Sequence, residues 1–541
     1  MAEQKEFNLL HENWLLVRKS DGSTEEVSLL NLFRHAHEYQ GLAGELPTQD
    51  VAILRLLLAI LHAVFRRYDP EGKFNPITSP SMALERWKSL WDRGAFPMGI
   101  IEEYLLHFEE RFWLFHPKYP FYQVALEEPV LTATGTKIIP TTFEASVLIG
   151  DIAESENKTR LFSFRTQKDC ISYAEAARWL LYTNSFDAAP GGRPSSAGIT
   201  IKGYGLSWLS QLGLVWAIGA NLFETLMLNF VLATQKETWG EPEIIWERKG
   251  TTSPDELLET EPAFPKEPCG LLTMQFRRMQ LIRCNTRKCV LGYRLWSGQA
   301  LNTENAFLET MTLWRKINKD TYTPKLHDEA RQLWRDFAAL FAVSDDHHRP
   351  GVVAWLDLLK RHDFLQLPLI QLAAAGVKYK QNTTIADVFT DSIRVNLNIL
   401  TSIGESWINR IIELIAATEK LVDQLGELAQ NLAKATGNTD GSREKTAAKE
   451  QAYFRLDTPF RRWLEKIDPS QDSMQNSCDQ WLEQARKIVR GIGEELVAQS
   501  GPQAIVGRYI KEKIKGKDVE NLYTAPKAFN RFLYRISKPF N

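Results

Sequence analysis

Four consecutive residues with metal-binding side chains lie in one polar stretch of the chain: Asp345, Asp346, His347 and His348. Carboxylates and imidazoles of this kind hold metal ions in many hydrolases. Adjacent residues of a loop rarely all point at one ion, and no second group of spaced His and Asp residues completes a ligand set. We therefore expect no metal, and a metal-dependent hydrolase that uses this cluster is the alternative from another functional class.

A glycine-rich turn, residues 188–198, is superficially similar to a phosphate-binding loop. The spacing between Gly192 and Gly198 is one residue too long, however, and Ile199 stands where the lysine of that motif should be. The chain also lacks the Gly-x-Ser-x-Gly elbow of the hydrolases that use a serine nucleophile. We expect neither catalytic activity nor a cofactor, and the glycines indicate a sharp turn or a close approach of backbone to a ligand.

The chain has five cysteines, an odd number scattered along the sequence: Cys170, Cys269, Cys284, Cys289 and Cys478. This pattern is typical of free thiols in a reducing cytoplasm rather than of a disulfide framework. Two of the cysteines, Cys284 and Cys289, are close in sequence, but a zinc site would need two further ligands. The sequence therefore predicts free thiols and no metal.

A second polar stretch, residues 376–384, has the side chains that nucleic acid needs. Gly376 permits a left-handed turn, and the stretch then offers mobile positive charge, a ring that could stack and two amides. These polar side chains are Lys378, Tyr379, Lys380, Gln381 and Asn382. The alternative is an ordinary solvated hairpin or a turn between helices.

The composition is that of a folded protein with several domains. The chain has 541 residues, 44% of them hydrophobic and 24% charged, and its formal net charge is −2. Such a balance excludes a protein that coats nucleic acid with its whole surface, although local basic patches remain possible. The first residues lack the order of a secretion signal, and the apolar run 51–65 is too short to cross a bilayer. We expect a cytoplasmic protein with a buried core helix and no membrane contact.

The first part of the chain mixes strand and helix patterns. A hairpin is predicted for residues 7–30 with its turn at residues 20–23, and helices are predicted after Pro47, at residues 81–91 and at residues 100–115. A long exposed loop at residues 150–159 precedes a helix at residues 172–182. Strands at residues 270–296 have interspersed basic residues: Arg277, Arg278, Arg283, Arg287 and Lys288.

From Asp391 onward the pattern is almost entirely helical. One apolar stripe runs from Ile411 to Leu432 and another from Trp481 to Leu496, with a loop expected at residues 434–449. The end, residues 508–538, has about three basic residues for each acidic one. The sequence thus predicts an α+β protein: a large mixed α/β domain at residues 1–390, followed by a helical bundle of the four-helix type at residues 391–541.

The polar protrusions together favour a scaffold that grips a nucleic-acid duplex. Phosphate contacts supply affinity in such proteins, and a few inserted groups supply discrimination. A purely structural scaffold whose polar tip touches nothing is the third possibility.

Several segments, in this order, resemble the large subunit of Cascade, the type I-E CRISPR surveillance complex, which is called CasA or Cse. The segments are residues 7–18, Pro120-Phe-Tyr-Gln123, Ala189-Pro-Gly-Gly192, residues 376–384 and Tyr453-Phe-Arg-Leu-Asp457. Their order and the total length carry the resemblance, which spans nearly the whole chain with a looser middle third.

The resemblance implies a non-catalytic subunit that reads the short protospacer-adjacent motif, the PAM, in double-stranded target DNA, while the guide RNA reads the target by base pairing. By position, Gln381 is similar to the family's wedge, which enters under the first base pair, with Lys380 and Asn382 beside it. Gly191 and Gly192 are similar to the family's glycine loop, although this turn is shorter and continues with Arg193. Lys288 is a candidate for the lysine finger.

The resemblance also implies partners. A flexible loop within residues 149–167 would help to dock the subunit near the 5′ handle of the guide RNA. The helical bundle would contact target DNA and other Cascade subunits, and the complex would recruit a helicase-nuclease. Lys378 is a weaker candidate for DNA contact than Lys380.

Overall fold

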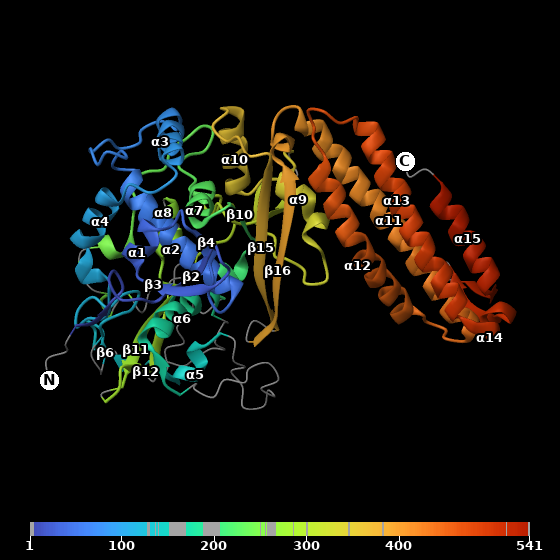
Figure 1. The fold of residues 1–541 in the computed structure, drawn as a ribbon. Coiled ribbons are helices and arrows are strands. Elements are labelled where there is room, and N and C mark those ends of the chain that lie inside the picture. Colours follow the sequence, from blue (N-terminus) through green and yellow to red (C-terminus); the bar gives the residue numbers. More distant parts are fainter. Residues whose placement is uncertain are drawn as a thin grey trace. The chain divides into compact units, whose positions relative to one another are not determined.

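A computed structural model describes most of the chain: residues 5–126, 130–135, 137–138, 140–150, 169–187, 206–248, 250, 252–254, 256, 267–284, 286–298, 301–344, 347–380, 384–514 and 517–538. Two compact units form (Figure 1). Unit 1 comprises residues 1–329, 343–365 and 371–392, and unit 2 comprises residues 330–342, 366–370 and 393–541. Unit 1 mixes helices with strands and unit 2 is mainly helical, which confirms the predicted α+β class.

Unit 1 begins with two small sheets. Strand β2 (Leu15–Lys19) pairs with β3 (Thr24–Val27) and with β4 (Tyr39–Leu42), and Gly22 adopts a φ of 82° in the turn of the hairpin. The predicted hairpin is confirmed, but its strands are shorter than expected. Strand β1 (Glu6–Asn8) pairs instead with β5 (Trp113–Phe115), and Ser28 caps helix α1 (Leu29–Arg34) by accepting a hydrogen bond from the backbone of Asn31.

Helix α2 (Pro47–Phe65) forms the core of unit 1. Proline at its first position suits a helix start, and nearly every following side chain is buried. The helix is long and apolar enough to cross a membrane by length and composition, but 94% of its apolar window is buried inside the structure, which confirms the predicted core helix. Next come α3 (Pro80–Arg93), α4 (Met98–His107) and η1 (Glu109–Arg111); the predicted helix at 100–115 is too long because β5 follows.

The rest of unit 1 contributes two larger sheets. In one of them β12 (Cys289–Ser297) lies between β11 (Arg277–Arg283) and β8 (Thr141–Glu144), and β9 (Ile171–Ser172) also pairs with β12. In the other, β15 (Leu369–Lys380) lies between β10 (Leu214–Ile218) and β16 (Thr384–Asn396). The remaining elements of this part are β6 (Val130–Leu131), β7 (Lys137–Ile138), α5 (Ala145–Leu148), α6 (Tyr173–Phe186), η2 (Trp208–Gln211), α7 (Leu222–Asn229), η3 (Ile245–Glu247), α8 (Pro268–Thr273), β13 (Trp314–Asn318), β14 (Thr321–Pro324) and α10 (Gly351–Arg361).

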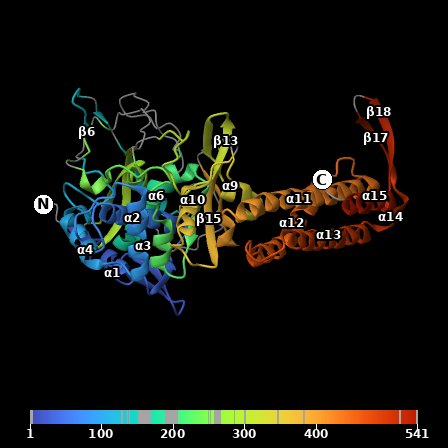
Figure 2. The ribbon, with the colours of Figure 1, turned by 90° about the horizontal axis from the view of Figure 1, so that it is seen from above.

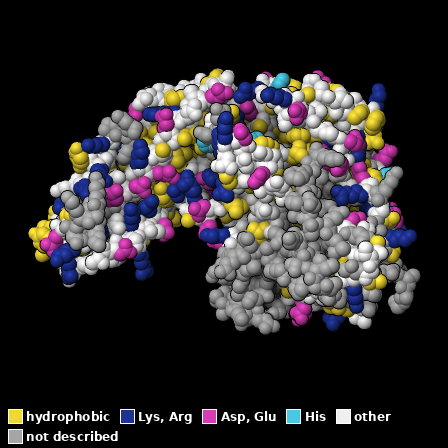
Figure 3. All heavy atoms as spheres, turned by 180° about the vertical axis from the view of Figure 1, so that it is seen from behind, with side chains coloured by type: hydrophobic (Ala, Val, Ile, Leu, Met, Phe, Trp, Pro, Cys, Tyr) yellow, Lys and Arg dark blue, Asp and Glu magenta, His cyan; other side chains and the backbone are white. Residues whose placement is uncertain are grey.

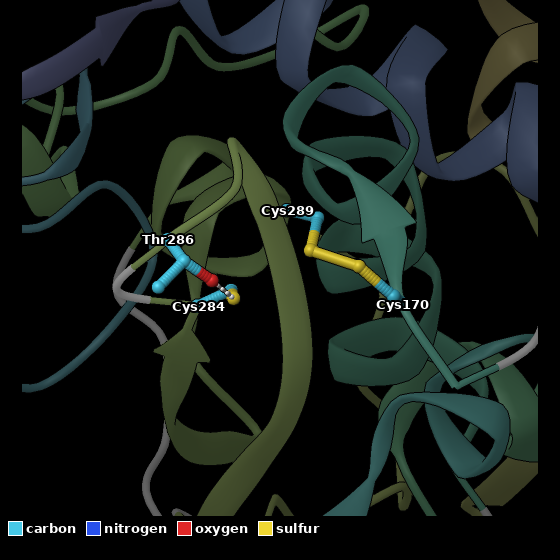
Figure 4. Close-up of a disulfide and its surroundings, with 4 residues drawn as sticks. All are labelled: Cys170, Cys284, Thr286 and Cys289. Atoms are coloured by element: carbon cyan, nitrogen blue, oxygen red, sulfur yellow. Dashed lines mark hydrogen bonds between the residues drawn. A yellow bond between two sulfur atoms is a disulfide. The ribbon is translucent and has the colours of Figure 1, made fainter.

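The predicted set of five free thiols is wrong. Cys170 and Cys289 form a disulfide with a Cα–Cα distance of 5.8 Å, although 119 positions separate them in sequence (Figure 4). Strand β9 lies antiparallel to the start of β12, so the fold brings the two cysteines together, and no sequence pattern indicates that pairing. Cys269, Cys284 and Cys478 are free.

Unit 2 is a bundle in which α11 (Gly404–Thr436) contacts α12 (Ser442–Lys466), α13 (Met474–Gln499) and α15 (Ala525–Ser537). The predicted loop at 434–449 is too long, because Gly437 and Gly441 adopt positive φ angles and turn the chain within a few residues. The prediction also missed a hairpin of β17 (Arg508–Ile514) and β18 (Lys517–Tyr523), which projects from the bundle beside α14 (Gly501–Val506) (Figure 2).

The core of the bundle consists of the predicted stripes. Leu425 on α11 and Trp481 on α13 are fully buried, which confirms both helical faces. The segment 330–342 joins this unit through Trp334, whose ring lies 4.3 Å from that of Phe460 and whose Nε1 donates to Asp457 at 2.9 Å. Its elements are η5 (Leu333–Asp336) and α9 (Phe337–Phe341), and η6 (Leu397–Leu400) precedes α11.

Candidate nucleic-acid interface

The polar stretch 376–384 forms the end of a long hairpin. Strands β15 and β16 are neighbours in one sheet and run side by side in Figure 1. Gly376 lies inside β15, next to Ala375, which pairs with Leu214, and its φ is not positive, so the expected left-handed turn there is wrong. The end of this hairpin, Gln381 and Asn382, lies outside the described residues. Lys380 is the last residue of β15.

Tyr379 anchors this hairpin from inside. Its hydroxyl lies 2.8 Å from the Ser210 hydroxyl and also donates to the backbone oxygen of Phe186. Burial raises the pKa of the Tyr379 hydroxyl well above its ordinary value, so the group stays protonated. The ring is therefore a support for the hairpin end rather than an exposed face for stacking.

The glycine-rich segment starts and ends beside this anchor. Gly191, Gly192 and Arg193 lie outside the described residues, whereas Asp187 and Leu206 on either side of the segment are described. The backbone N–H of Ser207 donates to the oxygen of Asp187 at 3.1 Å, which closes the segment between them. Arg277 Nε donates to the Asp187 carboxylate at 2.6 Å and fixes the same point.

The Tyr379 hydroxyl therefore forms hydrogen bonds on both sides of the Ser207–Asp187 contact. One is to Phe186, just before Asp187, and the other is to Ser210, shortly after Ser207. The residues that flank the glycine-rich segment and the end of the hairpin, almost 190 positions apart in sequence, are thus both held by Tyr379. No sequence pattern indicated this anchor, because a tyrosine in a polar stretch looks equally suited to solvent.

A cavity of about 350 Å³ lies against the hairpin at this point. Its charged lining consists of Asp328, Glu329 and Lys378, and the apolar side includes Leu206 and Phe389. Lys378 forms an ion pair with Glu329, which raises the pKa of Lys378 and lowers that of Glu329. The Lys378 side chain is 55% exposed, so it is available to solvent but already holds an acidic partner.

Two of the five basic residues that the sequence singled out near residue 280 are buried and do not face solvent. Arg277 and Arg278 are only 2% and 4% exposed, and they pair with Asp187 and Glu256. These two arginines stabilise the fold instead. Lys288 is exposed in the turn between β11 and β12.

The basic end of the chain is partly neutralised within unit 2. Arg535 donates to Glu427 at 2.6 Å and to Gln424 at 2.9 Å, and Lys434 lies 5.1 Å from the centre of the Tyr523 ring. Figure 3 shows Lys and Arg side chains interspersed with Asp and Glu along the bundle. At least one basic residue of this end, Arg535, is therefore paired with an acidic residue of α11.

The His pair of the polar cluster has structural contacts. His348 stacks on Phe307 with ring centres 4.0 Å apart, and burial lowers the pKa of its imidazole. His347 Nδ1 lies 3.0 Å from the Ser344 hydroxyl. Asp345 and Asp346 lie outside the described residues, and among those that are described no group of three His, Cys, Asp or Glu side chains could hold a metal.

Comparison with known proteins gives matches along almost the entire chain. Residues 8–492 match the family of the CRISPR-associated protein Cse1. A relative from Thermus thermophilus, the CRISPR-associated protein CasA/Cse1, is 26% identical over 554 residues, which cover 96% of this chain and 97% of the relative.

Solved structures with the same fold cover a similar extent. The crystal structure of Thermobifida fusca Cse1 is 29% identical and matches with a TM-score of 0.78, covering 99% of this chain and 98% of that chain. A chain of a CRISPR RNA-guided surveillance complex is 18% identical and matches with a TM-score of 0.64, covering 92% of this chain and 100% of its own length.

Proposed function

Because the chain belongs to the CRISPR-associated protein Cse1 family, we propose that it is the large, non-catalytic subunit of an RNA-guided CRISPR surveillance complex. In this role it recognises the PAM in double-stranded DNA, starts unwinding of the target and helps to recruit the helicase-nuclease. The solved surveillance-complex chain with the same fold supports the assembly, whose other partners are further Cascade subunits and the 5′ handle of the guide RNA. The cytoplasmic location stays part of this proposal.

One observation supports the DNA-reading role: Tyr379 holds the hairpin next to both ends of the glycine-rich segment. Tyr379 bonds to residues on both sides of the segment that contains Gly191 and Gly192, and it is two residues from Gln381. A glycine turn lets a DNA backbone or groove edge approach closely, because no side chain projects from it. In this proposal the hairpin of β15 and β16 presents a side chain that enters between base pairs.

We assign the roles of the individual residues from the resemblance to the Cse1 family. Gly191 and Gly192 contact the PAM from the minor groove, and Arg193 adds charge toward the phosphates. Gln381 is the wedge, flanked by Lys380 and Asn382. Insertion of a wedge costs a few kcal/mol of unstacking, which pairing with the guide RNA offsets. Lys288 and Lys378 are weaker candidates for phosphate contact.

The wedge is tested by Gln381→Ala in the assembled complex. We expect R-loop formation to slow at least about tenfold, the kinetic equivalent of roughly 1.4 kcal/mol, while association with PAM-containing duplex is partly retained. Gln40→Ala is the matched control, since Gln40 is an exposed glutamine whose amide donates to the oxygen of Ser20. Equal R-loop rates for wild type and Gln381→Ala would leave the hairpin end as a structural element only.

The glycine turn is tested by Gly192→Asp. An added carboxylate would clash with the groove and repel phosphate, so PAM-dependent binding should weaken in a gel-shift competition. Gly240→Asp adds the same charge at a described glycine with open space around its Cβ position, and it should leave binding unchanged. Unchanged PAM discrimination in Gly192→Asp would remove this turn from the interface.

A stoichiometric transition metal that is lost on His347→Ala would contradict the non-catalytic assignment.

A further inference from the structure

Three cysteines gather at one end of the β11–β12 pair. Cys289 is the first residue of β12, and Cys170 reaches it from the chain just before β9. Cys284 follows the last residue of β11, and its backbone N–H donates to the oxygen of Cys289 at 2.9 Å. Figure 4 shows all three around the same turn.

The strand register places Cys284 opposite Cys289. The antiparallel ladder has a register shift between Ile282 and Arg283 and ends with Arg283 opposite Val290. The backbone hydrogen bond from Cys284 to Cys289 continues this pairing by one position. Opposing residues in such a pair have Cα atoms about 4.5 to 5.5 Å apart. A disulfide can bridge Cα separations of about 4.4 to 6.8 Å. Cys289 therefore has a second potential partner that needs no larger separation than the 5.8 Å it spans to Cys170.

The surroundings of Cys284 favour its thiolate more than those of the other two free cysteines do. Its side chain is partly exposed, and its sulfur lies 3.3 Å from the Thr286 hydroxyl. That hydrogen bond, two backbone N–H groups and the charge of Arg287 lower the pKa of the Cys284 thiol. Cys269 and Cys478 are buried, and burial raises the pKa of each thiol. The attacking species in disulfide chemistry is the thiolate, which Cys284 forms most readily.

We propose that these three residues form an internal thiol–disulfide exchange site, in which Cys284 displaces Cys170 from Cys289. The Cys284 thiolate attacks Sγ of Cys289. A Cys284–Cys289 bond forms, the Cys170–Cys289 bond breaks, and the electron pair leaves with Cys170 as a thiolate that takes a proton from water. No external oxidant or reductant is consumed, because one disulfide replaces another.

Exchange changes what the bond holds together. The Cys170–Cys289 bond closes a loop of 119 positions, whereas a Cys284–Cys289 bond crosses a single turn. A long closed loop restrains the unfolded chain more than a short one does. Exchange releases the chain at Cys170, directly ahead of β9 and α6, and in sequence directly after the segment 149–167.

Tryptic peptides distinguish the two states. Cys170 lies in the peptide 169–178, Cys284 in 284–287 and Cys289 in 289–294, so each disulfide links a different pair of peptides. The full-length chain is purified without reductant, held at pH 8, quenched with acid and N-ethylmaleimide, and mapped by mass spectrometry. We expect peptides 284–287 and 289–294 to become linked while Cys170 becomes alkylated.

Three substitutions make the result decisive. Cys284→Ser should abolish the new link, whereas Cys478→Ser, the matched control, should leave it unchanged. Cys170→Ser with oxidised glutathione should give the Cys284–Cys289 link directly. Brief alkylation of the wild-type chain should modify Cys284 at least about tenfold faster than Cys478.

The proposal is overturned if, throughout the incubation at pH 8, the wild-type chain contains only the Cys170–Cys289 disulfide and Cys284 is recovered in its alkylated form. It is also overturned if Cys289 of Cys170→Ser is found reduced or bound to glutathione, or if the purified chain never contains the Cys170–Cys289 bond.

Discussion

The two units of this protein differ in the contacts that join their distant segments. In unit 1, charged side chains are buried and pair across long stretches of sequence: Arg55 with Glu309, 254 positions away, and Arg66 with Glu267, 201 positions away. In unit 2, the core consists of apolar helix faces, and an ion pair such as Arg455 with Glu495 has side chains that are 39% and 45% exposed.

This difference has physical consequences. A buried ion pair is costly to desolvate, so removing one partner leaves an uncompensated charge in the interior. An exposed pair is screened by water and contributes little. Besides its apolar core, unit 1 therefore depends on a few specific polar contacts between distant segments, and removal of one partner from such a contact is costly. Unit 2 is held by periodic apolar packing.

The largest expected effect is that of Glu309→Gln in unit 1. Both carboxylate oxygens of Glu309 accept from Arg55, at 2.8 and 2.9 Å, and Oε2 also accepts from Trp208 Nε1 at 2.8 Å. Loss of the charge leaves Arg55 buried without its counter-ion, and we expect the free energy of unfolding to fall by about 3 to 5 kcal/mol in urea titrations. The control is Glu495→Gln at the exposed pair with Arg455, where we expect a loss below about 1 kcal/mol. Equal losses in the two variants would break the comparison.

In unit 2 a comparable effect requires an apolar truncation. Leu425→Ala removes a fully buried side chain from α11 and leaves a cavity, so we expect a loss of about 2 to 5 kcal/mol by the same measurement. Asn409→Ala on the exposed side of α11 is the control, with an expected change within about 0.5 kcal/mol. If truncation of Leu425 were harmless, apolar packing would not be what stabilises the bundle.

Tyr379→Phe should have the smallest effect on stability. It removes the hydroxyl that bonds to Ser210 and Phe186 while keeping the ring, so we expect a loss of about 1 kcal/mol. Hydrogen exchange should nevertheless speed up at residues 206–212, because the end of the glycine-rich segment loses its anchor. Tyr534→Phe, at a tyrosine that is 62% exposed, should change neither quantity. Unchanged exchange in Tyr379→Phe would show that this hydroxyl does not pin the segment.

The same contrast explains what the sequence could and could not predict. The apolar stripes of α11 and α13 have a helical period and α2 is a long apolar run, so local pattern was enough to place these helices. The partners of Arg277 and Arg278 lie 90 and 22 positions away, so the two residues looked like a basic surface until the fold paired them. The bond between Cys170 and Cys289 was missed for the same reason.

The candidate interface was predictable only in part. The glycines at 191 and 192 and the polar stretch 376–384 could be chosen from residue types and from the resemblance to Cascade. Their common anchor could not, because Tyr379, Phe186 and Ser210 meet through strand β15 and the end of α6. Gly376 gave a misleading signal, since a glycine in a strand and a glycine in a turn look alike in sequence.

The central claim is that the hairpin end opens the first base pairs of the target after the PAM is bound. The most direct measurement compares R-loop formation by Gln381→Ala and wild-type complexes on a normal duplex and on a duplex whose first base pairs beside the PAM are mismatched and already open. The account predicts a slow variant on the normal duplex and wild-type rates on the opened one, because the wedge is then no longer needed. A variant that is equally slow on both duplexes, or equally fast on both, would contradict it.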